Sequence, residues 1–174
     1  RRYDVDGIHI DDYFYPYPLA APANADPAAA AMATLPGTRE FPDEPSWQRY
    51  REPGGTLARA DWRRENVNEL VRALHETVHR VKPWVRFGVS PFGIGRPDRR
   101  PPGIAGFSQY DQLFADVELW VEQGWMDYLS PQLYWPIAQK AIDAMQAYRS
   151  DQYLWWQVAE YTNDSFMIRS RTRG

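Results

Sequence analysis

The chain has 174 residues, of which 44% are hydrophobic, and a formal net charge of −3 at pH 7. This length suffices for one domain with a hydrophobic core, and the charge is too close to neutral for binding nucleic acid through its phosphates. The chain contains no cysteine, which excludes disulfides and thiolate metal sites, and no apolar stretch long enough to span a membrane. Because it begins at Arg1 rather than at a methionine, we expect it to be part of a longer protein.

The first half of the chain predicts a strand, a long loop, a helix and a second strand. Alternating β-branched residues predict a strand over Arg2–Ile10. An irregular segment follows to about Ala60, and its Ala/Pro-rich part at about residues 19–46 predicts a flexible loop insertion. Asp61 is a suitable N-cap for a helix that Pro83 ends, and Trp84–Ser90 predicts a buried strand. The helix has an apolar stripe formed by Trp62, Val67, Leu70, Val71, Leu74, Val78 and Val81.

The same alternation continues in the second half, and it is typical of a parallel α/β fold. No G-x-G-x-x-G sequence follows a predicted strand, which argues against a dinucleotide-binding sheet. A complete (β/α)₈ barrel needs about 250 residues, so we predict an α/β fold that is a partial TIM barrel, a single incomplete domain over residues 1–174. The remaining predicted elements are a helix at Tyr110–Gln123 ended by Gly124, a strand at Met126–Trp135, helices at Ala138–Ala147 and Asp151–Glu160, and a strand at Ser165–Arg171.

Two adjacent carboxylates, Asp11 and Asp12, follow the first predicted strand and are the catalytic candidates. In a barrel the carboxyl ends of the strands carry the active site. Glycoside cleavage needs one carboxyl group that donates a proton and a second that attacks the sugar or activates water. Side chains of successive strand residues diverge, so Asp11 and Asp12 are not expected to form one such pair. We expect Asp11 to face the barrel mouth and Asp12 to shape the subsite or to orient a neighbour; a turn at the strand end is the ordinary alternative for both.

The candidate substrate-binding residues lie near the same strand ends. His9 shares side-chain parity with Asp11, aromatic rings stack on sugar faces, and the amide of Gln132 is able to pair two sugar hydroxyls. At least one of Tyr13 and Tyr15 is expected to line the cleft, the alternative being a packed loop. The full set is His9, Tyr13, Tyr15, Ser90, Phe92, Gln132, Tyr134 and Trp135.

We interpret the histidine and arginine residues of the long predicted helix as solvated or structural residues and not as site residues. His75 and His79 lie four residues apart, but outside an H-E-x-x-H sequence and away from strand ends, so we interpret them as a solvated helix face rather than metal ligands. Arg63 and Arg64 are interpreted as solvated or structural residues that pair with acids of the neighbouring loop. No metal and no cofactor is expected.

Several motifs occurring in order resemble the glycosyl hydrolase-like 10 family. They are "DGIHIDDYFYPYP", "DWRRENVN", "FGVSPFGIGRP", "YDQLFADVELWVEQGWMDYLSPQLYWPIAQKA" and "WW" at Trp155–Trp156. The resemblance implies a (β/α)₈ barrel, a secreted or cell-envelope location, and cleavage of polysaccharide, including peptidoglycan glycan strands. "DGIHID" is also similar to the D-G-F-R-x-D strand of the alpha-amylase family, which implies that Asp11 is the nucleophile and His9 a supporting cation. That family has a glutamate acid where this chain has Ser90, so the similarity assigns no general acid.

The expected function is therefore that of a glycoside hydrolase with a polysaccharide partner. Two alternatives stay open: a non-catalytic carbohydrate-binding barrel, and a metal-dependent hydrolase with His9, Asp11 and Asp12 as ligands. Because a partial barrel leaves sheet edges unpaired, we expect the fragment alone to be inactive.

Overall fold

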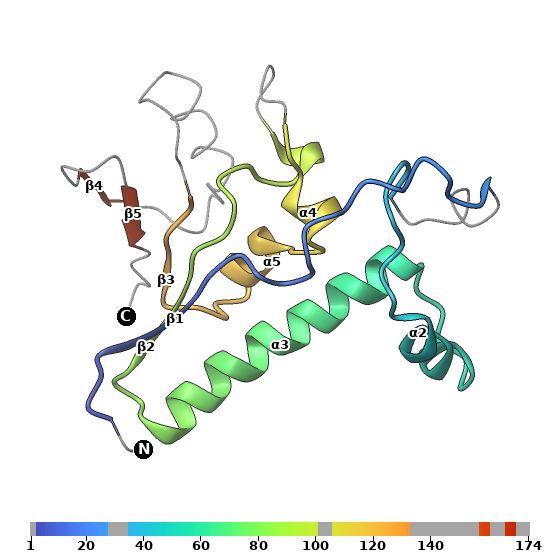
Figure 1. The fold of residues 1–174 in the computed structure, drawn as a ribbon. Helices are drawn as coiled ribbons and strands as arrows, with labels where there is room; N and C mark the ends of the chain where they lie inside the picture. Colours follow the sequence, from blue (N-terminus) through green and yellow to red (C-terminus); the bar gives the residue numbers. More distant parts are fainter. Residues whose placement is uncertain (1–2, 28–34, 101–105, 133–156, 161–165, 170–174) are drawn as a thin grey trace.

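The computed structural model describes residues 3–27, 35–100, 106–132, 157–160 and 166–169 of the chain (Figure 1). Its elements form a mixed α/β arrangement in which strands alternate with helices, as predicted. In chain order they are β1 (Gly7–Ile10), α2 (Glu44–Arg51), α3 (Arg59–Val81), β2 (Arg86–Val89), a 3₁₀ turn (Pro97–Arg99), α4 (Gln109–Gln112), α5 (Val117–Glu122), β3 (Tyr128–Leu129), β4 (Gln157–Glu160) and β5 (Phe166–Arg169).

The sheet has the strand order β1-β2-β3-β5-β4. Its first three strands are parallel, with Ile10 opposite Val89 and Val89 opposite Leu129, so their carboxyl ends meet at one edge. The long helix α3 connects β1 to β2 after the loop and packs against β2, as Figure 1 shows. Parallel strands joined by helices are the arrangement expected of a partial TIM barrel.

The hydrophobic core lies between these strands and α3 and α5. Phe87, Leu113 and Trp120 are fully buried there, and the indole of Trp120 donates a 2.7 Å hydrogen bond to the side chain of Asn68 on α3. A Cβ at Gly88 would lie 2.0 Å from the ring of Tyr128, so only glycine permits the close approach of β2 and this ring. The core thereby fixes the relative positions of the strand ends that carry the candidate site.

The structure corrects the predicted course of the helices. α3 begins at Arg59 after the N-cap residue Ala58, so the N-cap predicted at Asp61 is wrong and that residue lies in the first turn. The predicted helix Tyr110–Gln123 is two short helices, because the Ser108 and Asp116 side chains cap separate N-termini and Phe114 takes a left-handed φ of 54° between them. The left-handed Gly124 that follows α5 is confirmed.

The apolar stripe predicted on α3 is only partly buried. Leu70 is 50% exposed and Val81 37% exposed, whereas the polar residues Arg63 and Asn68 are buried. The solvated alternative for Arg63 is therefore wrong, and its pairing with acids of the loop is confirmed, since it hydrogen-bonds Asp43 at 2.7 and 2.8 Å and also contacts Glu40. Arg63 therefore joins α3 to the preceding loop through ion pairs, whereas the spacing of apolar residues on the helix predicts only apolar contacts.

Two further differences concern the segments at either side of the core. The loop after β1, expected to be irregular, contains α2, and an isolated antiparallel bridge between Ala20 and Thr38 closes the Ala/Pro-rich part. Gln157–Glu160, expected to end a helix, is a strand, and β5 pairs antiparallel with β3 instead of continuing the parallel order. The predicted helix at Ala138–Ala147 lies outside the described residues.

Candidate active site

The two adjacent aspartates after β1 point in different directions, as strand geometry predicts. Asp11 is exposed, whereas Asp12 is 5% exposed and its carboxylate accepts a hydrogen bond from the hydroxyl of Tyr17. The backbone N–H of Asp12 donates to Oδ1 of Asp11 at 3.0 Å. One carboxylate is thus presented to solvent at the strand end, and the other is held inside the loop by a phenol.

Gln132, which follows β3, contacts residues at the ends of β1 and β2. Its side-chain amide donates to Oδ1 of Asp11 and, at 3.0 Å, to the backbone oxygen of Ser90 at the end of β2. A parallel bridge with Phe92 and a 2.9 Å hydrogen bond from its backbone N–H to the oxygen of Pro91 hold Gln132 in register. The hydroxyl of Ser90 donates to the backbone oxygen of Ser130 at 2.8 Å. Three predicted site residues, Asp11, Ser90 and Gln132, therefore meet at the carboxyl edge of the parallel sheet.

His9 lies on β1 and contacts a residue absent from the predicted set. Its Nδ1 is 3.0 Å from the hydroxyl of Tyr128, and the two rings stack with centroids 5.5 Å apart. Burial raises the pKa of Tyr128, which keeps its hydroxyl protonated and able to donate to the imidazole. The aromatic residues of the Met126–Trp135 stretch were the available signal for Tyr128, but the prediction placed the site only after the strand.

The tyrosines of the loop after β1 take different positions. Tyr13 is 80% exposed. Tyr15 is half-buried, packs edge-on against Phe41 and Phe114, and lines a pocket of about 270 Å³ between the insertion and the start of α3. This pocket is not the expected cleft at the aspartates, so the expectation that Tyr13 or Tyr15 lines that cleft stays a prediction. The lining of this pocket does not include Asp11 or Asp12.

Tyr17 is the phenol that donates to Asp12. Its ring stacks on Phe107 at 5.2 Å, and Phe107 in turn meets Phe92 edge-on at 4.9 Å. Burial and the neighbouring Asp12 carboxylate raise the pKa of Tyr17 well above its usual range, so it remains a hydrogen-bond donor. Tyr17, Phe107 and Phe92 form an aromatic row between the ends of β1 and β2, in which only Phe92 belongs to the predicted set.

Other predictions for the site differ in their outcome. Tyr134 and Trp135 lie outside the described residues. The structure places Ser90 at the end of β2, where the alpha-amylase family has its acid. Within the described parts of the chain, the histidine and carboxylate atoms close enough to share an ion belong to His75, His79 and Asp127, and not to the set proposed for a metal-dependent hydrolase.

The model of the family described as "Glycosyl hydrolase-like 10" matches residues 1–163. The chain belongs to the glycosyl hydrolase-like 10 family. It is 38% identical over 145 residues to glycosyl hydrolase YngK of Bacillus subtilis strain 168, covering 81% of this chain and 25% of that protein. It is 39% identical over 144 residues to glycosyl hydrolase DigH of Escherichia coli K12, covering 80% of this chain and 28% of that protein.

The chain thus spans about a quarter of the length of these glycosyl hydrolase-like 10 relatives. Both are named as glycosyl hydrolases, and the family match confirms the resemblance stated from the motifs. The described helices include none with the length and apolar character needed to cross a membrane.

Proposed function

We propose that the protein is a glycosidase that hydrolyses O-glycosidic bonds of a polysaccharide, with Asp11 as its reacting carboxylate. The observation that carries this proposal is the position of Asp11: an exposed carboxylate at the carboxyl edge of parallel strands, anchored by the amide of Gln132. In TIM barrels this edge is where catalytic residues lie. Family membership supports the reaction class.

The site divides the work between its two aspartates. Asp11 is exposed, and its carboxylate is suited to attack an anomeric carbon or to activate water. Asp12 is buried and held by Tyr17, so we assign it a positioning role, in which its backbone N–H orients the Asp11 carboxylate. The second carboxyl group that the reaction needs is assigned to a part of the protein beyond the described residues, since Ser90 follows β2 and the chain spans a quarter of its relatives.

Aromatic side chains beside Asp11 support a sugar polymer as the substrate. Tyr13 is exposed and Phe92 partly exposed, each within three residues of a strand end, and aromatic rings stack on the C–H surface of sugar rings. We extend the proposal to a bacterial cell-wall glycan as the substrate and to a secreted or cell-envelope location, on the basis of the family resemblance.

A non-catalytic carbohydrate-binding barrel is the second candidate, and the Ser90 at the end of β2 favours it, because no carboxylate stands there. The deciding experiment incubates the complete gene product with a panel of purified polysaccharides, including peptidoglycan glycan strands with and without their peptides. Glycan binding and the release of new reducing ends are measured on the same samples. A glycosidase releases reducing ends from at least one polymer, whereas binding without any product would replace the proposed function by the second candidate.

A further inference from the structure

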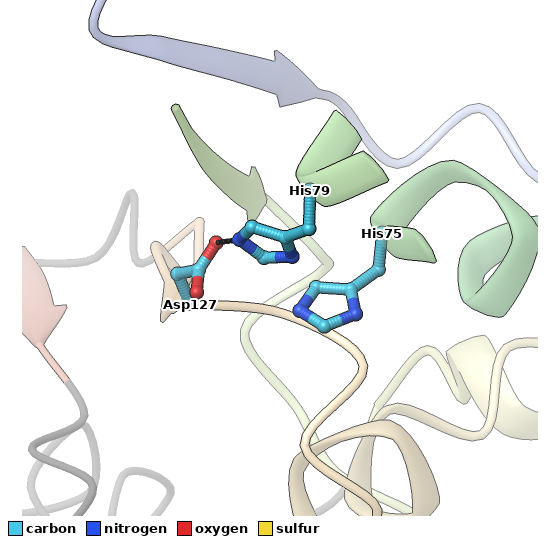
Figure 2. A group of neighbouring side chains, drawn as sticks. All are labelled: His75, His79 and Asp127. Carbon is cyan, nitrogen blue, oxygen red and sulfur yellow. Dashed lines mark ion pairs between the residues drawn. The ribbon is translucent and has the colours of Figure 1, made fainter. Parts of the chain in front are cut away.

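A second group of polar side chains lies at the opposite end of the strands. His75 and His79 share one face of α3, and Asp127 lies directly before β3 (Figure 2). The imidazole rings meet edge-on with centroids 4.2 Å apart, and Nε2 of His79 is 3.1 Å from Oδ2 of Asp127. One donor atom from each of the three residues lies within 4.8 Å of the other two. The interpretation of the histidines as a solvated face is therefore wrong, since the helix face turns toward the sheet.

The sheet holds the Asp127 carboxylate in place. Oδ2 accepts a 2.7 Å hydrogen bond from the backbone N–H of Phe87 on β2, and the N–H of Asp127 donates to the oxygen of Phe87 at 2.8 Å. Figure 2 shows a ring nitrogen of each histidine turned toward this carboxylate. The side chains of His79 and Asp127 are 29% and 28% exposed, so an ion from solution has access to a group that is already partly desolvated.

The imidazole rings of His75 and His79 offer nitrogen ligands to a metal ion. A metal binds the neutral form of imidazole through a ring nitrogen. A single ion shared by the two rings and the carboxylate would link all three side chains.

We propose that His75, His79 and Asp127 bind one divalent transition-metal ion of the zinc class and thereby tie the C-terminal half of α3 to the start of β3. Two imidazoles with one carboxylate suit zinc and its neighbours in the first transition row, whereas Mg²⁺ and Ca²⁺ prefer oxygen ligands. Histidines spaced i, i+4 present their rings on one side of a helix, which is a common way to supply two ligands. A water molecule completes the tetrahedron.

The observed geometry needs only a small adjustment to reach coordination. Zinc bonds of about 2.0–2.2 Å place tetrahedral ligand atoms roughly 3.3–3.5 Å apart. The His79–Asp127 pair is already at 3.1 Å, and the remaining separations are at most 4.8 Å, so ion binding requires the His75 ring to approach the other two ligands. Because the group precedes β3 while Asp11 and Gln132 follow β1 and β3, the ion is assigned a structural role, remote from the reacting carboxylate.

The test is a calorimetric titration of the complete gene product with ZnCl₂, after chelation and without a polyhistidine tag. Visible absorption after Co²⁺ addition reports the coordination geometry, and thermal unfolding with and without Zn²⁺ reports the structural role. The variants are His75→Gln, His79→Gln and Asp127→Asn, in which the asparagine oxygen still accepts from the Phe87 N–H. His9→Gln, which removes the third histidine of the chain, is the matched control.

We expect one tight Zn²⁺ equivalent, tetrahedral Co²⁺ absorption and a raised unfolding temperature in the unsubstituted protein and in the His9→Gln variant. Each of the three ligand substitutions should weaken Zn²⁺ binding at least tenfold and remove the thermal shift. His75 is only partly buried, so its glutamine variant should fold, as checked by circular dichroism. The proposal is overturned if Zn²⁺ does not bind at micromolar concentration, or if it binds the His75→Gln and His79→Gln variants as tightly as the unsubstituted protein.

Discussion

The side-chain amide of Gln132 donates a hydrogen bond to the carboxylate of Asp11 across 121 residues of sequence. The same amide donates to the backbone oxygen of Ser90, so one side chain joins the ends of β1, β2 and the stretch after β3. This contact restricts the direction in which the Asp11 carboxylate points, and an oriented reacting group is worth orders of magnitude in rate.

Gln132→Ala should therefore lower kcat roughly ten- to hundredfold, because a reacting group displaced by about 1 Å loses on that order. KM should change little if Gln132 acts mainly through Asp11. Steady-state kinetics on the polysaccharide that the protein cleaves provide the measurement. Gln123→Ala, at an exposed position after α5, is the control and should leave both constants unchanged. An unaltered kcat for Gln132→Ala would remove the positioning role.

Tyr17→Phe should destabilise the loop after β1, because it leaves the buried carboxylate of Asp12 without the phenol that donates to it. An unsatisfied buried acceptor costs about 1–3 kcal/mol of unfolding free energy. Urea denaturation measures the loss. Tyr13→Phe, which removes an equivalent hydroxyl from an 80% exposed ring, is the matched control and should unfold at the same urea concentration as the unsubstituted protein.

Arg63→Ala should be among the most destabilising single substitutions in α3. The guanidinium is almost fully buried, pairs with Asp43 and Glu40, and lies 5.0 Å from the centroid of the Phe114 ring. Breaking a buried ion pair by removing one partner costs about 3–5 kcal/mol. Arg72→Ala, which removes an exposed pair with Glu69 on the same helix, should have little effect. Equal denaturation midpoints for the two variants would contradict this account of the helix face.

The acid limb of the stability profile should depend on Asp43. Burial by itself raises the pKa of this carboxyl, but hydrogen bonds and charges from Arg63 and Arg59 outweigh burial and hold the pKa below its ordinary 3.8. The unfolded chain therefore binds a proton before the folded one does, so the Asp43 contribution is complete above about pH 4 and disappears as the pH falls through the folded-state pKa. Unfolding free energies measured between pH 7 and pH 2 should show this loss, and Asp43→Asn should flatten that limb. An identical acid limb in both proteins would exclude Asp43 as its source.

The parallel part of the fold was predictable because it depends on local signals. The apolar residues around β2 predict a buried strand, Pro83 follows the end of α3, and left-handed Gly124 follows α5. The break between α4 and α5 was not predicted, since the apolar stripe continues across it and only the Ser108 and Asp116 caps reveal two helix starts. Burial of Arg63 depends on acids about 20 residues earlier in the chain, a pairing that helix periodicity does not contain.

For the site, strand ends identified Asp11, Ser90 and Gln132, whose proximity follows from parallel register. The contacts of the other site residues could not be predicted from their positions in the sequence. Tyr17 rather than Tyr13 reaches Asp12, and His9 meets Tyr128, because a loop's path and the tilt of a ring are set by packing with Phe107 and Gly88. The partial burial of His75 and His79 was not predicted for the same reason, since Asp127, which pairs with His79, is remote in sequence.

The most direct test of the central claim compares turnover and binding in the Asp11→Asn variant of the complete gene product. Asparagine preserves the size of the side chain and an oxygen that accepts from Gln132, but it is neither a nucleophile nor a base. We predict that kcat falls on the order of 10³-fold or more while the Kd for the polysaccharide changes by less than about threefold. A variant that retains the turnover of the unsubstituted protein would show that Asp11 is not the reacting carboxylate.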